Sequence, residues 1–342
     1  MSRVDRATFV RRLGIALAVA GSGAPSALAA DGGDYHEHPG FKFAFLAGLT
    51  TSPRFVPLQY GAQDACALVG CSSTWGGSAE ADADALAKAV ETAVAGGADG
   101  IALTLIDPQA LERAVERAEG AHVPVVSFGS DLAWAAGSRR VAYVGVDPHA
   151  LGVELAARIA RLVPRGDVAL LAGSHELAAL GPIARSVVRS LERQRSAVRP
   201  HVVSTGADVY AQLSSVSRYA AAHPDVRGLF ALDEGSTQGL VQALQKLPLR
   251  KAGVRAGAFG VLPEVLTLID DGGLDFTVDE QPYLQGFVAA MQLFLAKLSG
   301  GLVQPCDLHA HAVFVTKANL QPYRSTRTRF EGSSSKQKYP IS

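Results

Sequence analysis

The chain has 342 residues, of which 48% are hydrophobic and 19% are charged, a composition typical of a globular protein with a large core. This length predicts two domains. The formal net charge is zero, so the composition does not support binding to nucleic acid.

The first 29 residues have the pattern of a signal peptide. A basic head precedes a short apolar stretch at 13–19, and Ala27-Leu28-Ala29 offers a small-x-small cleavage site. The apolar stretch is short for a membrane span, although an N-terminal anchor stays an alternative. Arg11-Arg12 resembles a twin-arginine export signal, with ordinary secretion as the other route. We expect cleavage after 29, a polar linker at 30–40 and a periplasmic mature protein.

Short apolar runs alternate with helical patterns along the rest of the chain. In the first half, we expect strands at 43–47, 72–75, 101–105 and 123–128. In the second half, strands are expected at 141–144, 168–171, 201–204, 228–232, 256–259 and 276–278. Helices are expected between them; one example is the stripe formed by Leu86, Val90, Ala93 and Val94.

The expected strands are continuously apolar, which is typical of parallel strands buried on both faces. Repeated strand–helix units therefore predict an α/β protein with doubly wound parallel sheets. About ten units are more than one open sheet usually carries, so we expect two lobes. Because open parallel sheets bind ligands beyond the carboxyl ends of their strands, two facing lobes predict a polar cleft between them.

Several segments occur in an order that resembles the periplasmic sugar-binding proteins of the ribose-binding type, which have the type I fold. The resemblance spans 43–317. It is carried by Gly96-Gly97-Ala98-Asp99-Gly100-Ile101, Val123-Pro124-Val125-Val126-Ser127-Phe128, Tyr143-Val144-Gly145-Val146-Asp147, His223-Pro224-Asp225-Val226, Leu262-Pro263-Glu264, Asp279-Glu280-Gln281-Pro282-Tyr283-Leu284-Gln285-Gly286-Phe287 and Phe314-Val315-Thr316-Lys317.

The resemblance implies a two-lobed monomer that closes over a sugar or polyol and then docks on the permease of an ABC importer. It implies a three-stranded hinge, with crossovers near 144–147, 278–281 and 302–309. The N-terminal lobe then comprises 41–145 plus 281–305, and the C-terminal lobe 146–280 plus 306–323. A sensor module that feeds a chemoreceptor or a histidine kinase is the alternative that the sequence leaves open.

Two aromatic residues and one arginine are candidate ligand contacts. Phe55 matches the position where the family places an aromatic residue after the first strand, and it is otherwise a core residue. Trp75 ends the second expected strand next to Gly76-Gly77, where its ring can stack on a sugar or pack against a helix. Arg54 can point into the cleft or into solvent.

Three carboxylates complete the predicted site, because charged acceptors bind vicinal hydroxyl groups strongly. Asp131 and Asp233 follow strands, and Glu280 lies on the second crossover. The alternative role of each is a helix cap or a hinge ion pair. The chain departs from the family pattern at Gly181-Pro182, where an arginine is common, and at Gly129 and Gly260, where polar residues are common.

Other features point away from catalysis. No Gly-x-Ser-x-Gly elbow occurs in a strand–turn–helix setting, and no phosphate-binding loop is present. We therefore predict no enzyme, no cofactor and no metal site, with a hydrolase as the remote alternative. Cys66 and Cys71 are predicted to form a disulfide, with two buried thiols as the alternative and Cys306 unpaired. The polar tail at 324–342 is expected to be solvated.

Overall fold

The computed structural model describes residues 37–80, 82–131, 142–173, 176–206, 209–325, 328–332 and 334–335. The predicted signal peptide at 1–29 lies outside these residues, as does most of the predicted linker. The chain from Gly40 onward forms one compact unit. Among the described residues, no helix is both long enough and apolar enough to cross a bilayer.

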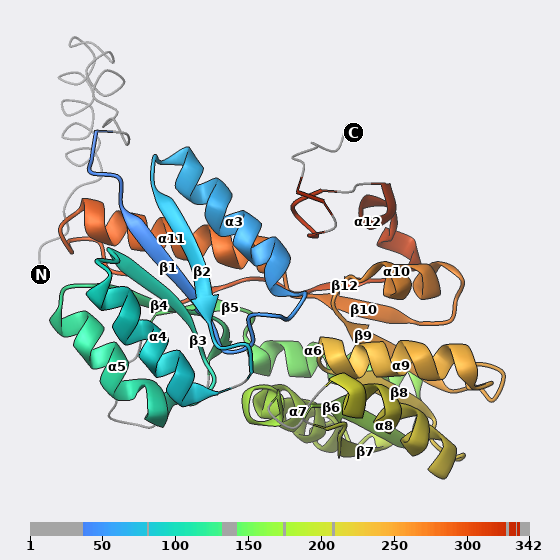
Figure 1. Ribbon diagram of the computed structural model, residues 1–342. Coiled ribbons are helices and arrows are strands. Elements are labelled where there is room, and N and C mark those ends of the chain that lie inside the picture. The colour runs from blue at the N-terminus through green and yellow to red at the C-terminus, as the bar shows by residue number, and fades with distance from the viewer. Residues whose placement is uncertain are drawn as a thin grey trace, which may run out of the picture. The chain divides into compact units, whose positions relative to one another are not determined.

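The first lobe is built on a six-stranded parallel sheet with the strand order β11-β5-β4-β3-β1-β2 (Figure 1). Its strands are β1 (Lys42–Ala47), β2 (Ser72–Gly77), β3 (Gly100–Leu105), β4 (Val125–Asp131), β5 (Ala142–Gly145) and β11 (Leu308–His309). Its helices are α3 (Phe55–Leu68), α4 (Ala83–Ala95), α5 (Pro108–Gly120) and α11 (Pro282–Leu298).

The second lobe repeats this plan with the strand order β12-β10-β9-β8-β6-β7, in which β12 alone is antiparallel to its neighbour. Its strands are β6 (Arg165–Ala172), β7 (Ala197–Ser204), β8 (Gly228–Ala231), β9 (Arg255–Phe259), β10 (Phe276–Asp279) and β12 (Val313–Val315). Its helices are α6 (Pro148–Leu162), α7 (Glu176–Arg193), α8 (Val209–Ala222), α9 (Glu234–Lys246), α10 (Pro263–Asp270), η1 (Lys317–Asn319) and α12 (Gln321–Ser325).

The continuous apolar runs become buried strands, as the sequence predicts. Every residue of β3 and of β8 is buried, because helices cover both faces of each sheet. Separate apolar clusters lie on the two faces of each sheet. The two doubly wound α/β lobes predicted from the sequence are therefore confirmed.

Two glycines allow α3 and α11 to pack with their backbones in contact. A Cβ atom at Gly61 would lie 2.0 Å from the carbonyl oxygen of Tyr283, and one at Gly286 would lie 2.0 Å from that of Leu58. No side chain larger than hydrogen fits at either position. This packing fixes the beginnings of the two helices side by side.

The chain passes between the two sheets three times. The first two passages follow β5 and β10, close to the expected crossovers. The third differs from the expectation, because β11 pairs with β5 and belongs to the first sheet. The backbone N–H of Ala310 donates to the carbonyl of Gly145 at 2.8 Å and extends this pairing. The first lobe therefore runs to His309, beyond the predicted boundary at 305.

The predicted Cys66–Cys71 disulfide is not formed, and all three cysteines are free. Cys66 lies on the buried face of α3, where burial raises the pKa of its thiol to about 12. The Cys71 thiol instead contacts the carbonyl of Val69 at 3.7 Å. Of the alternative, two buried thiols, only Cys66 meets the expectation, because Cys71 is half-buried.

The predicted solvated tail is wrong at Thr328 and Arg329, which pack against the rest of the chain. Thr328 is 1% exposed, and Arg329 forms an ion pair with Asp64 of α3 at 2.7 Å. Periodicity gave no sign of this packing, because the segment is irregular and its partner lies far away in the sequence.

Candidate functional site

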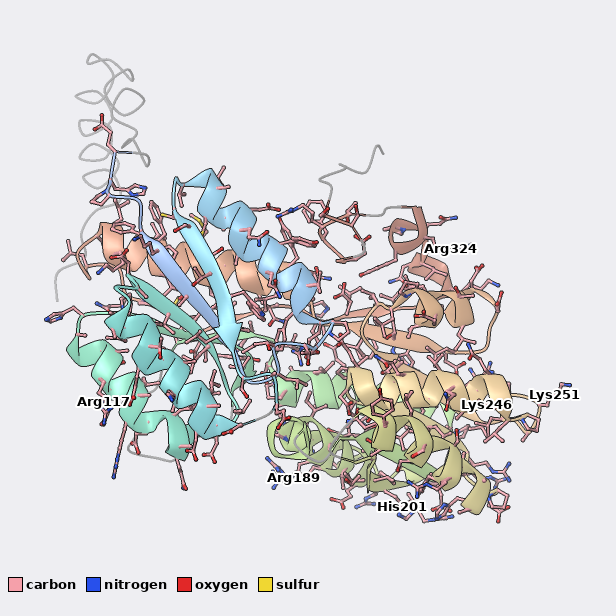
Figure 2. The ribbon with its side chains drawn as sticks, in the orientation of Figure 1. Arg117, Arg189, His201, Lys246, Lys251 and Arg324 are labelled. Atoms are coloured by element: carbon pink, nitrogen blue, oxygen red, sulfur yellow. The ribbon has the colours of Figure 1, made fainter. Side chains whose placement is uncertain are left out.

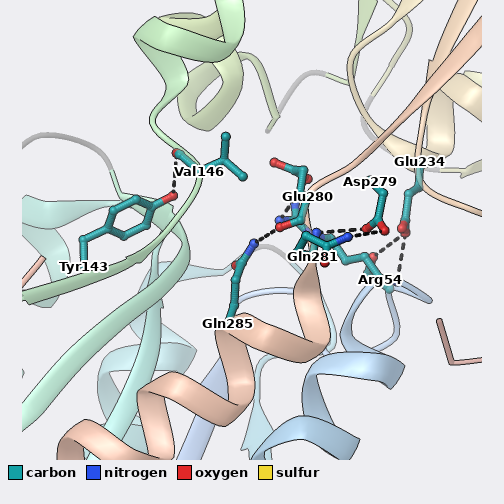
Figure 3. Close-up of polar contacts among 9 residues, drawn as sticks. Arg54, Tyr143, Val146, Glu234, Asp279, Glu280, Gln281 and Gln285 are labelled. Atoms are coloured by element: carbon teal, nitrogen blue, oxygen red, sulfur yellow. Dashed lines mark hydrogen bonds and ion pairs between the residues drawn. The ribbon is translucent and has the colours of Figure 1, made fainter. Parts of the chain in front are cut away.

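A polar contact joins the two lobes at the carboxyl ends of β1 and β8 (Figure 3). The loop after β1 supplies Ser52 and Arg54, and Glu234 begins α9 directly after β8. The backbone N–H of Arg54 donates to Glu234 Oε2 at 3.0 Å, and the hydroxyl of Ser52 donates to the same oxygen at 3.2 Å. One carboxylate oxygen of the second lobe is therefore held by two donors from the first.

Arg54 also reaches the crossover between β10 and α11. Its Nη2 atom lies 3.4 Å from Glu280 Oε2, and the side chains of Arg54 and Glu280 are only 19% and 18% exposed. Gln285, on the first turns of α11, donates from Nε2 to the carbonyl of Glu280 at 2.7 Å. Arg54 thus contacts two carboxylates from different parts of the fold, Glu280 through its guanidinium and Glu234 through its backbone N–H.

Two departures from the family pattern make room for this contact. Gly129 has φ +67°, and a Cβ atom there would lie 3.3 Å from Nη2 of Arg54. Gly260 has φ +84°, and a Cβ atom there would lie 3.1 Å from Glu234 Oε1. Side chains at these positions would crowd Arg54 and Glu234, so the two glycines leave space for those longer side chains.

Aromatic rings line the first lobe beside Arg54. The centroid of Phe55 lies 5.5 Å from that of Trp75 and 6.0 Å from that of Phe128. Phe55 is 6% exposed and belongs to the core, whereas Trp75 is half-buried within β2, which continues past the predicted end at Trp75 to Gly77. The structure brings the two predicted aromatic residues together, and Trp75 is the more accessible of them.

Two buried polar atoms near these rings have no hydrogen-bond partner among the described residues. They are Nε1 of Trp75, which is a donor, and Oε1 of Gln285, which is an acceptor. Unsatisfied buried groups cost free energy and are uncommon in folded proteins. A ligand with hydroxyl groups can both accept from the first and donate to the second.

Asp233, a predicted ligand contact, caps a helix. It is 8% exposed and accepts hydrogen bonds from the backbone N–H of Ser236 at 2.8 Å, from its hydroxyl at 2.6 Å and from the N–H of Gly173 at 2.9 Å. This is the alternative role weighed for it, because Asp stabilises a helix N-terminus. The backbone of Asp131 ends β4, but its side chain lies outside the described structure.

The second crossover is held by a buried carboxylate and a strained residue. Gln281 adopts φ 60°, an unusual conformation for a residue other than glycine. Its backbone N–H and its Nε2 donate to Asp279 at 2.9 and 2.6 Å, and the hydroxyl of Tyr323 donates to Asp279 at 2.9 Å. Strain held in place by such bonds is typical of functional segments.

Burial raises the pKa of two carboxylates of this region, Glu234 and Asp279. It raises the pKa of Glu234 from 4.5 to about 7, although the positive charge of Arg54 and the hydrogen bonds from Arg54 and Ser52 act in the opposite direction. Burial also raises the pKa of Asp279. Glu234 therefore changes its charge near neutral pH.

A cavity of about 280 Å³ opens beside these residues. Its walls are the loop before α3 with the first turn of that helix, the beginning of α9, the turn at 259–263, the second crossover and the C-terminal residues Glu331 and Gly332. Arg54, Asp233 and Glu280, all predicted from the sequence, line it. Ser52, Glu234 and Gln285 were not predicted as contacts; for Glu234, its place in the polar loop after β8 was the available signal.

The model of the periplasmic binding protein domain matches residues 43–301. The chain belongs to this family. A xylose/arabinose-binding protein, XylF, of Sulfolobus acidocaldarius is 36% identical over 318 residues, which cover 88% of this chain and 77% of the relative. Family membership places this binding protein outside the cytoplasm and among ligand-binding components of transport systems, not among enzymes.

Solved structures share the fold. A solute-binding protein from Burkholderia graminis, in complex with D-arabinose, matches with a TM-score of 0.73 and 22% identity over 82% of this chain and 96% of its own. A carbohydrate transporter protein from Acidothermus cellulolyticus, in complex with myo-inositol, matches with a TM-score of 0.73 and 22% identity over 86% of this chain and 100% of its own. At this identity the likeness establishes the two-lobed fold of the binding protein.

Proposed function

We propose that this binding protein captures a small sugar or polyol, with an aldopentose as the first candidate, and delivers it to the permease of an ABC importer. The observation that carries the proposal is the polar cluster of Arg54, Glu234 and Glu280 between the lobes, adjacent to a half-buried tryptophan. The name of the Sulfolobus relative, a xylose/arabinose-binding protein, supports the choice of a pentose.

The chemistry of the cluster suits a ring with several hydroxyl groups. Carboxylates accept hydrogen bonds from vicinal hydroxyls, and a guanidinium donates to ring and hydroxyl oxygens. The apolar C–H face of the sugar would pack on the ring of Trp75. Nε1 of Trp75 and Oε1 of Gln285 would gain the partners that they lack in the described structure.

Ligand binding would then change the contacts between the lobes. The donors of Ser52 and Arg54 that now hold Glu234 are the groups that a sugar hydroxyl would engage, so a bound sugar would bridge the same two walls. Rotation about the three crossovers would admit and enclose it. The monomeric state and export through the twin-arginine route are parts of the same proposal.

Calorimetric titration of the full chain with D-xylose, L-arabinose and myo-inositol tests the proposal. At least one of them should bind, and sugar at 100 times its Kd should stabilise the protein by about 2.7 kcal/mol through linkage. Trp75→Phe keeps an aromatic ring but removes the Nε1 donor, so it should weaken binding about tenfold.

Tyr210→Phe is the matched control, because this ring is 85% exposed on α8 and should leave the affinity unchanged. A folded protein that binds none of the three sugars would contradict the proposed ligand class. Unchanged affinity in Trp75→Phe would instead show that Nε1 of Trp75 does not donate to the ligand.

A further inference from the structure

The C-terminal residues 328–332, which we call the C-terminal clamp, lie on the opposite lobe from the helix that precedes them. The preceding helix α12 belongs to the second lobe, where Leu320 is 3% exposed and Tyr323 packs on the same apolar cluster. Arg324 of α12, which is labelled in Figure 2, forms an ion pair with Asp270 of α10 at 2.7 Å. The clamp itself contacts α3 and α11 of the first lobe.

The principal contact of the clamp is a two-pronged ion pair. Arg329 donates from Nε to Asp64 Oδ2 at 3.0 Å and from Nη2 to Asp64 Oδ1 at 2.7 Å. The side chains are only 15% and 20% exposed, so water screens this pair less than a surface pair. The hydroxyl of Tyr283 on α11 donates to Asp64 as well, at 2.9 Å. Asp64 therefore joins the clamp to both helices.

Apolar contacts surround this ion pair. The guanidinium of Arg329 lies over the ring of Tyr60 at 4.3 Å. Phe330 packs edge-on against Tyr283, with centroids 4.7 Å apart. A Cβ atom at Gly332 would lie 2.7 Å from Cδ of Pro57, so the clamp touches the first turn of α3, next to Arg54. These contacts make the clamp a packed part of the first lobe.

The connection between the two anchors is short. Only two residues separate Ser325 of α12 from Thr328 of the clamp. Since an extended chain spans at most about 3.6 Å per residue, these two ends cannot move more than about 11 Å apart. A larger separation of α12 from α3 requires the Arg329–Asp64 contact to break.

We propose that the C-terminal clamp is a fourth link between the lobes, which opposes their separation and favours the arrangement in which Ser52 and Arg54 contact Glu234. The proposal rests on the lobe rotation of the proposed function. Glu331 and Gly332 also form one wall of the cavity beside the cluster. Release of the clamp would therefore both free the lobes and open that side of the cavity.

Small-angle X-ray scattering of the sugar-free protein tests this directly. A chain that ends at Ser325 lacks 17 residues. If these residues did not link the lobes, their removal would simply lower the radius of gyration. We expect the radius of gyration to rise, because the lobes separate. Arg329→Gln in the full chain should shift it in the same direction, whereas Arg324→Gln, which removes an ion pair within one lobe, should not.

Titration with D-xylose provides the second readout, because a population shift toward separated lobes lowers the apparent affinity. Arg329→Gln should weaken binding about threefold to thirtyfold, and Arg324→Gln should have no effect. If the truncated chain, shown to be folded by circular dichroism, has a smaller radius of gyration, the clamp proposal is overturned. If the radius rises but none of the sugars binds the unmodified protein, the clamp stands and the proposed ligand fails.

Discussion

The two walls of the cleft are built on opposite principles. On the first lobe, the wall is aromatic, and Trp75 and Gln285 each keep a buried polar atom without a partner among the described residues. On the second lobe, polar side chains bind one another: Asp233 accepts three hydrogen bonds, and the hydroxyls of Thr205 and Ser236 lie 2.8 Å apart. The first wall therefore has unsatisfied polar atoms that a ligand can bind, whereas the polar groups described on the second wall mostly bind one another.

Glu234 is the exception on the second wall. Its carboxylate is bound by donors from the opposite lobe, Ser52 and Arg54, and by none of the described residues of its own lobe. The second lobe therefore supplies a hydrogen-bonded frame, with the Glu234 carboxylate directed across the cleft. The first lobe supplies the donors and the ring surfaces that a ligand would use.

The largest expected effect comes from breaking the frame of the second wall. Asp233→Ala removes the cap of α9 and leaves the N–H of Gly173 buried without its acceptor. We expect the free energy of unfolding to fall by about 3 kcal/mol, from the lost cap together with the unsatisfied donor. Urea denaturation with and without sugar measures this change.

Asp107→Ala is the control for Asp233→Ala, because Asp107 caps α5 at an exposed position and does not line the cavity. It should cost only about 1 kcal/mol. Equal losses of unfolding free energy in the two variants would mean that Asp233 contributes no more than an ordinary helix cap. A stable Asp233→Ala protein with weakened sugar binding would instead restore Asp233 as a ligand contact.

An intermediate effect is expected from Glu234→Gln, which changes how the free energy of unfolding depends on pH. The pKa of Glu234 is raised from 4.5 to about 7 in the folded protein, so the folded state holds this proton more tightly than the unfolded state. Its contribution therefore favours folding at low pH and is lost as pH rises from about 4.5 to about 7. Gln at this position removes that contribution.

The measurement is the free energy of unfolding of both proteins between pH 4 and 8. The wild-type value minus the Glu234→Gln value should fall across the window and then stay level. Subtraction also cancels the contribution of Asp279, whose pKa is raised by burial in both proteins. Glu264→Gln, on the exposed side of α10, is the control for removal of a carboxylate. Parallel curves for wild type and Glu234→Gln would contradict the assigned role.

Much of the fold was predictable because its signals are local. Strands such as β3 are continuously apolar, and aspartates such as Asp107 and Asp147 precede helices in the pattern of N-caps. The resemblance to a known family placed Glu280 on the second crossover, whereas the sequence left open whether Arg54 points into the cleft or into solvent; both residues line the cavity. These features are encoded in short segments, and the signals in such segments do not depend on contacts with distant residues.

The remaining features depend on residues that meet only in the folded chain. Arg54 and Glu234 are 180 positions apart, and Asp64 and Arg329 are 265 apart. No periodicity or spacing links either pair. Asp233 shows a different limit, because a carboxylate after a strand is equally suited to capping a helix and to binding a ligand. Only the donors around it decide between these roles.

The smallest effect is expected from Ser52→Ala, which removes one of the donors that the first wall directs to Glu234. The lost hydrogen bond, 3.2 Å long and partly buried, favours the ionised carboxylate, so its removal should raise the pKa of Glu234 further. A hydrogen bond worth about 1 kcal/mol corresponds to a shift of somewhat less than about one pKa unit. Carbon-13 NMR titration of the Glu234 carboxyl would detect this shift.

Ser214→Ala is the control, because the Ser214 hydroxyl bonds to its own helix α8; this variant should leave the titration of Glu234 unchanged. A downward shift in Ser52→Ala would show that Ser52 does not donate to this carboxylate in solution. Of the two donors from the first lobe, the backbone N–H of Arg54 would then remain.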